Sequence, residues 1–116
     1  MNVDCIFCRI AAGEIPATIV AERGDAVAFR DVNPQAPTHV LVVPREHIAS
    51  VAHTSGDHSA QVLGNLMRFA VEVAATLGLA ADGYRLVVNT GRHGGQTVDH
   101  LHIHLLGGRQ LHWPPG

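Results

Sequence analysis

Three histidines at strict two-residue spacing constrain the fold of this chain more than any other feature. His100, His102 and His104 alternate with the apolar residues at positions 101, 103 and 105. Successive side chains of a β-strand point to opposite faces, so a strand places the three imidazoles on one face, about 6.6 Å from one to the next. A helix would scatter them around its axis. The pattern predicts a strand with one face in the core and the other available for chemistry on an anionic group.

Less specific interpretations of these histidines also exist. A single histidine on a strand is usually a satisfied surface or core residue, and a histidine tract can simply bind metal. An expression tag is excluded, because the histidines alternate with core residues inside the domain. The Gly94–Gly95 turn directly before the run favours a functional site over packing alone.

Length and charge limit the classes of protein to consider. We expect 116 residues to form one domain over residues 1–116, and a formal net charge of −2 gives no general attraction to nucleic acid or an anionic membrane. No apolar stretch approaches the ~20 residues of a membrane span, and the N-terminus lacks the layout of a signal peptide. We therefore expect a cytoplasmic protein. The absence of lysine excludes Schiff-base chemistry on a lysine.

Hydrophobic periodicity predicts an α+β fold. A short helical turn over 4–12 is stopped at Gly13, and strands are expected over 18–22, 26–31, 39–43, 84–89 and the histidine run. A long helix follows a capping region at 54–57 and ends at Gly78. Its apolar positions are Val62, Leu63, Leu66, Met67, Ala70, Val73, Ala74 and Leu77. We expect an antiparallel sheet with helices on one face. The proline-containing tail over 109–116 is expected to be irregular. We expect the large apolar ring of Trp113 to pack against another surface, and a partner subunit is one candidate.

Several further motifs accompany the histidine run in order along the chain. They lie at residues 5–10, 13–16, 33–39, 94–98, 106–109 and 113–116. Together with the alternating histidines, they resemble the histidine triad superfamily and, within it, the histidine triad nucleotide-binding branch. The resemblance covers residues 4–116. The glycine-glycine-arginine segment and the tryptophan-containing ending make the dinucleoside polyphosphate hydrolase branch a poorer match.

The resemblance implies a fold, an assembly and an activity. It implies a five-stranded antiparallel sheet with one long and one short helix, and a homodimer in which two such sheets form one ten-stranded sheet. It also implies hydrolysis of purine nucleoside 5′-phosphoramidates through a covalent nucleotidyl-histidine, with no cofactor needed for catalysis. Two alternatives stay open: a dinucleoside polyphosphate hydrolase or nucleotidyl transferase of the same superfamily, and a nucleotide-binding or scaffolding module with negligible turnover.

The resemblance also assigns catalytic roles to individual residues. His102 matches the nucleophile, attacking phosphorus through Nε2 while its other nitrogen bonds a nearby backbone carbonyl. His104 and Thr97 match groups that contact phosphate oxygens, and His39 matches a fourth histidine bordering the triad. A hydrogen-bonded core histidine is an equally good interpretation of His39. His100, the first of the three, completes the catalytic set.

The expected substrate pocket extends over several segments. Asp31 matches the carboxylate that accepts ribose hydroxyls, Asn89 lies beside the phosphate, and the backbone around Gly95 and Gln96 supplies amide donors. The purine pocket is implied to consist of Phe7, Ile10, Phe29 and Val32, although their spacing also fits ordinary core. Trp113 is implied to reach the partner's site and to shape the leaving-group side.

Cys5 and Cys8 form a Cys-x-x-Cys pair with three open interpretations. A redox motif lacks a preceding thioredoxin-like strand, two inert thiols are possible, and the pair supplies half of a structural zinc site. The resemblance implies His47 and His100 as the remaining zinc ligands. Asp99 departs from the family pattern, and either an arginine partner or a strand that starts at His100 would explain it.

Overall fold

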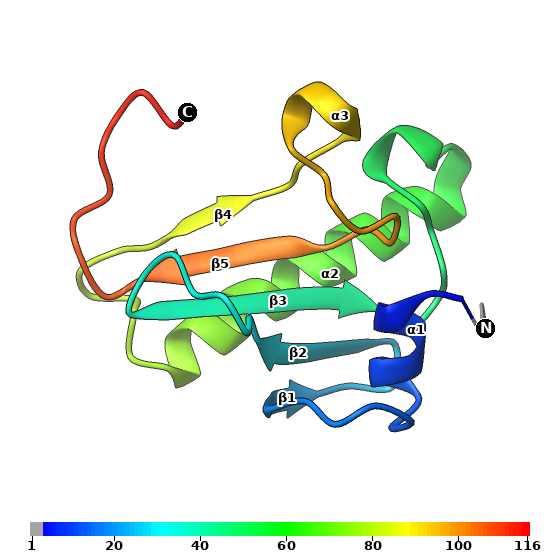
Figure 1. The fold of residues 1–116 in the computed structure, drawn as a ribbon, viewed down its shortest axis with the longest axis horizontal. Helices are drawn as coiled ribbons and strands as arrows, with labels where there is room; N and C mark the ends of the chain where they lie inside the picture. The colour runs from blue at the N-terminus through cyan, green and yellow to red at the C-terminus, as the bar shows by residue number, and fades with distance from the viewer. Residues whose placement is uncertain (1–3) are drawn as a thin grey trace.

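The computed structural model describes residues 4–116 as a five-stranded antiparallel sheet with helices on both sides (Figure 1). The strands are β1 (Ile19–Glu22), β2 (Ala26–Arg30), β3 (Thr38–Pro44), β4 (Arg85–Val87) and β5 (Ile103–Gly107). The helices are α1 (Ile6–Ala11), the 3-10 turn η1 (Val51–His53), α2 (Gly56–Thr76) and α3 (Gly91–Gly94). The order across the sheet is β1-β2-β3-β5-β4, with every neighbouring pair antiparallel. The predicted α+β class is confirmed.

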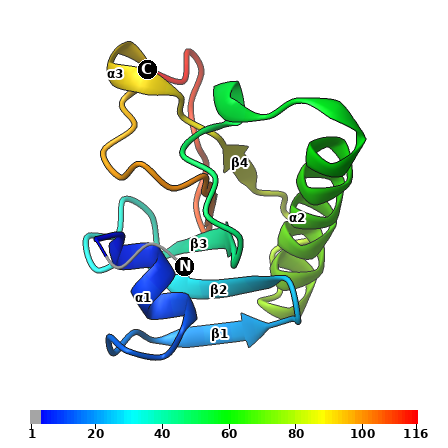
Figure 2. The same cartoon turned by 90° about the vertical axis from the view of Figure 1, so that its right-hand side faces the viewer.

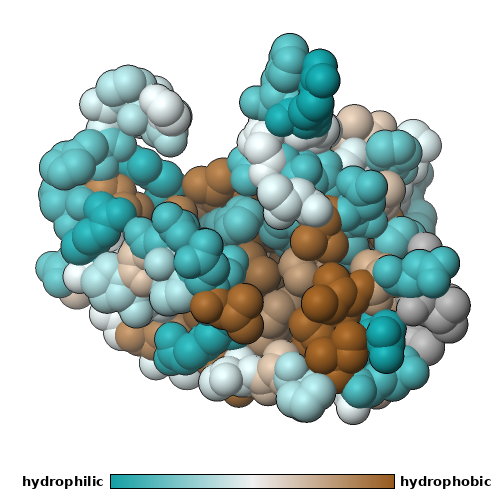
Figure 3. Space-filling view, viewed as in Figure 1, coloured by the Kyte–Doolittle hydropathy of each residue, from teal (hydrophilic) through white to brown (hydrophobic). Residues whose placement is uncertain are grey.

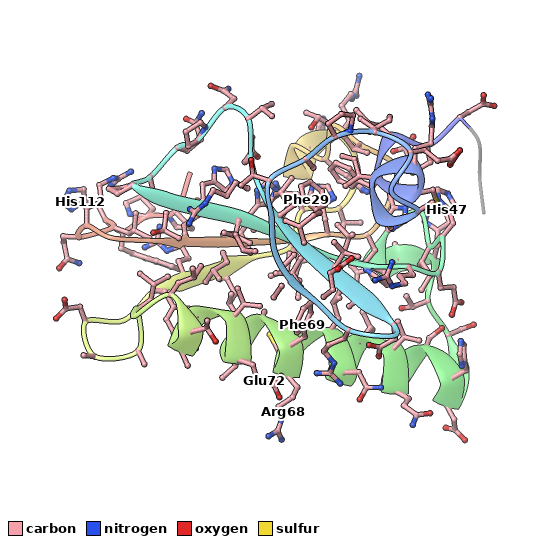
Figure 4. The ribbon with its side chains drawn as sticks, turned by 90° about the horizontal axis from the view of Figure 1, so that it is seen from below. Phe29, His47, Arg68, Phe69, Glu72 and His112 are labelled. Carbon is pink, nitrogen blue, oxygen red and sulfur yellow. The ribbon has the colours of Figure 1, made fainter. Side chains whose placement is uncertain are left out.

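The prediction that all helices cover one face is wrong. Figure 2 shows α2 on one side of the sheet and α1 on the other. Because β2 and β3 are buried on both faces, they are almost continuously apolar rather than alternating. Figure 4 shows the two sides through two aromatic residues: Phe69 lies between α2 and the sheet, and Phe29 lies on the α1 side. The sheet therefore separates two apolar clusters.

Helix α2 presents a narrower buried stripe than its sequence predicts. Its buried residues include Leu66, Phe69 and Val73, whereas Met67 is 42% exposed. Phe69, absent from the predicted stripe, is 3% exposed and contacts the Arg23 guanidinium, which lies 5.4 Å from its ring centre. Met67 follows the buried Leu66 directly and lies at the margin of the buried stripe. Helical spacing alone therefore did not distinguish it from the buried positions. Among residues 4–116, no helix is long and apolar enough to cross a membrane.

Strand β5 begins later than the histidine pattern predicts. Its ladder with β3 ends at the pair of Val42 and Ile103, so His100 and His102 precede the strand. The next backbone groups have other partners: Leu101 N–H donates to Ile48 O at 2.6 Å. The alternation nevertheless persists through this extended segment. Positions 101, 103 and 105 are buried in the α2-side cluster, so the histidines lie on the α1 side.

Candidate active site and metal centre

The three histidines lie on the α1 side of the sheet, as the alternation predicted. The ring centres of His102 and His104 are 4.9 Å apart, and Phe7 of α1 meets the His102 ring edge-on at 5.2 Å. Figure 3 views this side of the molecule and shows a hollow between the C-terminal segment and α3. Of the three imidazoles, His100 is fully buried, His102 is 4% exposed and His104 is half-buried.

His102 is held in a single tautomer by a backbone carbonyl. Its Nδ1 lies 2.7 Å from the carbonyl oxygen of His100, which only accepts, so Nδ1 carries the proton and donates. Nε2 then holds the lone pair. Nε2 has no hydrogen-bond partner among residues 4–116. Because every fully buried side-chain nitrogen and oxygen of these residues does have one, Nε2 must be accessible to solvent, although His102 as a whole is only 4% exposed. The arrangement leaves one fixed nucleophilic atom facing outward.

A second chain of hydrogen bonds orients His104. Gln35 N–H donates to His39 Nδ1 at 3.0 Å, so the proton of neutral His39 is on Nε2. That Nε2 lies 2.9 Å from His104 Nδ1 and donates to it, so the His104 proton is on Nε2. Asp31 Oδ2 lies 3.4 Å from the same His39 Nε2. The network therefore presents a lone pair on His102 and an N–H donor on His104.

Burial keeps these side chains neutral. It lowers the pKa of His104 from 6.5 to about 4, with further lowering by His102 and His39 and a smaller opposing effect of the Asp31 carboxylate. Burial also lowers the pKa of His39, again opposed by Asp31. Neutral imidazoles are required for the hydrogen bonds of this chain, because a second proton on His104 would remove the acceptor on Nδ1.

The predicted ribose-binding carboxylate has two structural contacts. Asp31 Oδ1 accepts the Asn33 N–H at 2.8 Å, and Oδ2 faces His39. Lone-pair positions remain on both oxygens, so the carboxylate can still accept a hydrogen bond from a hydroxyl. Val32, the next residue, is fully exposed and packs on nothing within residues 4–116. An apolar side chain standing free beside this carboxylate suits contact with a ligand.

The other expected purine-pocket residues are mostly core. Phe7, Ile10 and Phe29 are 6%, 9% and 3% exposed and belong to the cluster beneath α1. The rings of Phe7 and Phe29 meet edge-on at 5.4 Å. These side chains pack α1 on the sheet, which is the alternative interpretation of their spacing, and only their edges are available to a ligand.

The glycine-rich turn differs from the expected amide cradle. Gly95 N–H donates to Arg92 O and Gln96 N–H to Gly91 O, both at 3.1 Å, because the turn closes helix α3. The Gln96 side chain is also occupied, since its Nε2 donates to Ala49 O at 2.7 Å. The expected amide donors are therefore already used within the fold. Their role here is to shape the turn, with Gly95 in the left-handed region at φ 83°.

Two further expected site residues, Thr97 and Asn89, keep part of their surface exposed. Thr97 is exposed after α3, and Asn89 is half-buried between β4 and α3. The expected tail residue Trp113 is 80% exposed, and Arg85 secures the tail beside it by donating to His112 O at 2.8 Å. The tail is irregular, as its prolines predicted.

Cys5, Cys8, His47 and His100 come together as one group, although up to 95 residues separate them. Their four ligand atoms lie within 4.8 Å of one another. His100 Nε2 donates to Pro44 O at 2.8 Å, which leaves its Nδ1 lone pair facing the two thiols. Burial lowers the pKa of His100 and keeps it neutral, as a ligand must be. Among the described residues, neither cysteine forms a disulfide, and both sulfurs face imidazole nitrogens of the group.

The spacing of the group fits tetrahedral zinc. Cys5 Sγ lies 3.2 Å from His100 Nδ1, and Cys8 Sγ lies 3.3 Å from His47 Nδ1 and 3.5 Å from His100 Nδ1. The two Nδ1 atoms are 3.2 Å apart. Standard zinc bond lengths give ligand edges of about 3.6 Å for sulfur–nitrogen and about 3.3 Å for nitrogen–nitrogen. Two thiolates and two imidazoles are a common structural zinc set, and the four protein ligands leave no position for water.

Asp99 is exposed in a bend before β5, so neither a buried carboxylate nor an arginine partner is needed to explain it.

Gln35 was not predicted from the sequence, because its contribution to the site is a backbone N–H. No side-chain pattern marks such a donor.

Comparison with known proteins assigns the family. The model of the HIT domain matches residues 12–111 of the chain. The chain belongs to the HIT domain family. It is 54% identical to an uncharacterized HIT-like protein of Synechococcus elongatus, over the full length of both chains. It is 49% identical to the purine nucleoside phosphoramidase of Escherichia coli, covering 96% of this chain and 92% of the relative.

Solved structures of HIT proteins share the fold. A HIT family hydrolase from Legionella pneumophila is 52% identical with a TM-score of 0.93, covering 97% of this chain and 99% of that chain. A histidine triad protein from Clostridium difficile is 41% identical with a TM-score of 0.91, covering 96% of each chain. The resemblance to the histidine triad superfamily seen in the sequence is thereby confirmed.

Proposed function

We propose that this HIT protein hydrolyses purine nucleoside 5′-phosphoramidates to the 5′-nucleotide and an amine. The observation that carries the proposal is the fixed tautomer of His102, whose Nδ1–H is bonded to His100 O and whose Nε2 faces outward. The P–N substrate class is supported by the Escherichia coli relative, whose name is purine nucleoside phosphoramidase. Neutral imidazole with a free lone pair is a competent nucleophile at neutral pH.

The reaction proceeds in two displacements at phosphorus. In the first, His102 Nε2 forms a bond to phosphorus while the P–N bond breaks, and the leaving nitrogen takes up a proton from solvent to depart as the amine. In the second, water attacks phosphorus, the P–Nε2 bond breaks, and a proton is released with the nucleotide. The proton stays on His102 Nδ1 throughout, and its hydrogen bond to the His100 carbonyl stabilises the charged nucleotidyl-imidazole.

The neighbouring residues bind the phosphate and the sugar. His104 donates its Nε2–H to a phosphoryl oxygen, and His39 maintains that proton position through His104 Nδ1. Thr97 adds a hydroxyl donor, and Asn89 lies on the leaving-group side. The Asp31 carboxylate accepts hydrogen bonds that the ribose hydroxyls donate. The amides of Gly95 and Gln96 do not enter this scheme, because both are bonded within the turn.

Zinc is the metal that the Cys5–Cys8–His47–His100 group would hold. When bound, it would crosslink α1, the segment after β3 and the triad, and with four protein ligands it would activate no water. A cysteine pair that forms no disulfide suits the cytoplasmic location expected from the sequence. Catalysis itself needs no metal in this scheme.

A homodimer is the proposed assembly. Strand β4 is an edge of the sheet, and exposed apolar residues lie directly after it and on α2: Val88, Met67 and Val71. Pairing of two β4 edges would form a ten-stranded sheet and cover these side chains. The exposed Trp113 would then be available to the partner's site.

Turnover of a fluorogenic adenosine phosphoramidate tests the proposal. His102→Ala is expected to lower turnover more than about 10³-fold while nucleotide binding persists. Diadenosine polyphosphate serves as the competing substrate, and its preferential cleavage would move the protein to the sister branch. Nucleotide binding without turnover of either substrate would favour the binding-module alternative.

A further inference from the structure

His100 connects the candidate metal centre to the proposed nucleophile. Its ring is fully buried, with Nδ1 against the two thiols and Nε2–H donated to Pro44 O at 2.8 Å. Its carbonyl oxygen accepts the His102 Nδ1–H at 2.7 Å. The ring and the carbonyl belong to one residue, so the position of the ring restricts the carbonyl that fixes the His102 tautomer.

Phe7 provides a second connection. It lies between the two cysteines in α1, and its ring meets the His102 ring edge-on at 5.2 Å and the His100 ring at 5.9 Å. Cys5 caps α1 by accepting the Cys8 N–H at 3.3 Å. A metal ion bound by both sulfurs would therefore restrain the helix turn that holds Phe7 against the nucleophile.

We infer that Cys5, Cys8 and His47 are positioning residues for His102, acting through a metal ion and the shared ligand His100. This inference rests on the proposed role of His102 as nucleophile. It goes beyond a structural crosslink, because it predicts an effect on the reactivity of one imidazole rather than on folding alone. The proposed coupling runs through two residues of backbone, from the ligand His100 to His102.

The mechanism of the effect is tautomer control. When His100 is free to shift, the carbonyl no longer holds the His102 Nδ1–H, and the other neutral tautomer becomes populated. That tautomer carries its proton on Nε2 and has no lone pair for phosphorus. Nucleotide binding depends on other residues, Asp31 and His104, so transfer to His102 falls while affinity does not.

The test compares two variants that each remove one ligand. Cys8→Ser alters α1, whereas His47→Asn lies in the segment after β3, away from Phe7 and His102 in sequence. Val73→Ala is the matched control, because it removes buried volume on the opposite face of the sheet without touching either site. Zinc content, single-turnover nucleotidylation and Kd for AMP are measured for each. The His102 Nδ1–H resonance is followed by NMR of 15N-labelled imidazoles.

Both ligand variants are expected to lose zinc, to lose or exchange-broaden the His102 Nδ1–H resonance, and to nucleotidylate about 10- to 100-fold more slowly at unchanged Kd. Val73→Ala is expected to keep the resonance and the rate. An unchanged resonance in zinc-free His47→Asn would overturn the inference, as would wild-type protein that binds no zinc. If wild type cleaves no phosphoramidate, the proposed function fails, and the resonance still decides the coupling.

Discussion

Acid should destabilise this protein through His104 in particular. The folded protein holds this side chain neutral, with a pKa of about 4 against 6.5 for an ordinary histidine. The unfolded chain therefore binds the proton more tightly than the folded protein does. The contribution of neutral His104 to the free energy of unfolding is fully present above about pH 6.5 and decreases as the pH falls toward 4. Below that pH both states are protonated and this contribution no longer changes.

The size of the effect follows from the pKa gap. A difference of about 2.5 pH units at about 1.36 kcal/mol per unit gives about 3.4 kcal/mol. His104 is partly exposed, so solvent screening reduces the expected loss to about 2–3 kcal/mol. His39 adds to it in the same direction, since burial also lowers its pKa.

The assay is urea unfolding followed by far-UV circular dichroism, from pH 7.5 to pH 4, at fixed protein concentration with chelator present. His104→Gln is the matched variant, because it keeps a polar side chain but cannot titrate. The difference in unfolding free energy between wild type and variant cancels the carboxylates that both share. We expect wild type to lose its advantage as pH falls through this range. A pH-independent difference, or one that grows in acid, would refute the neutral hydrogen-bond chain.

Three other predictions concern the metal, a turn and the tail. Zinc at about 100 times its Kd should raise the unfolding free energy by about 2.7 kcal/mol, and Cys8→Ser should abolish the rise in thermal melts. Gly108→Ala should cost about 1–3 kcal/mol in urea unfolding, because φ is +94° and a Cβ would lie 2.8 Å from Pro37 Cβ, whereas Gly24→Ala, at an open position, should cost far less. Deleting residues 111–116 should change the order of preferred amine leaving groups more than the Kd for AMP, and an unchanged order would contradict a role for Trp113 in the leaving-group side.

The shared face of the three histidines was predictable because period-two alternation is a local property of the chain, whereas β3 was predictable from its continuous apolar, β-branched run. The β5 start was not, because it depends on long-range partners: Ile48 O takes the Leu101 N–H, and the Pro44 carbonyl takes the His100 side chain. Helix placement on both faces was also missed. The apolar residues of β2 and β3 indicate burial on both faces only once the order of strands is known.

The residues of the site were predictable from motifs, but their hydrogen bonds were not. The sequence marks His39 and His104, yet the Gln35 N–H that sets their tautomers is a backbone group without a sequence signal. The opposite holds for Gly95 and Gln96. Their glycine-rich context suggested free amides, and the α3 turn instead uses both of them internally.

Mass spectrometry of the enzyme quenched in alkaline denaturant, where a P–N bond to imidazole survives, tests the central claim most directly. Wild-type protein is mixed with adenosine phosphoramidate, quenched within one turnover and digested for peptide mapping, with His102→Ala beside it. We predict one adenylyl group on the peptide containing residues 100–104, localised to His102 and absent from the variant. Turnover with no adduct at any quench time, or an adduct on another residue that persists in His102→Ala, would contradict the account.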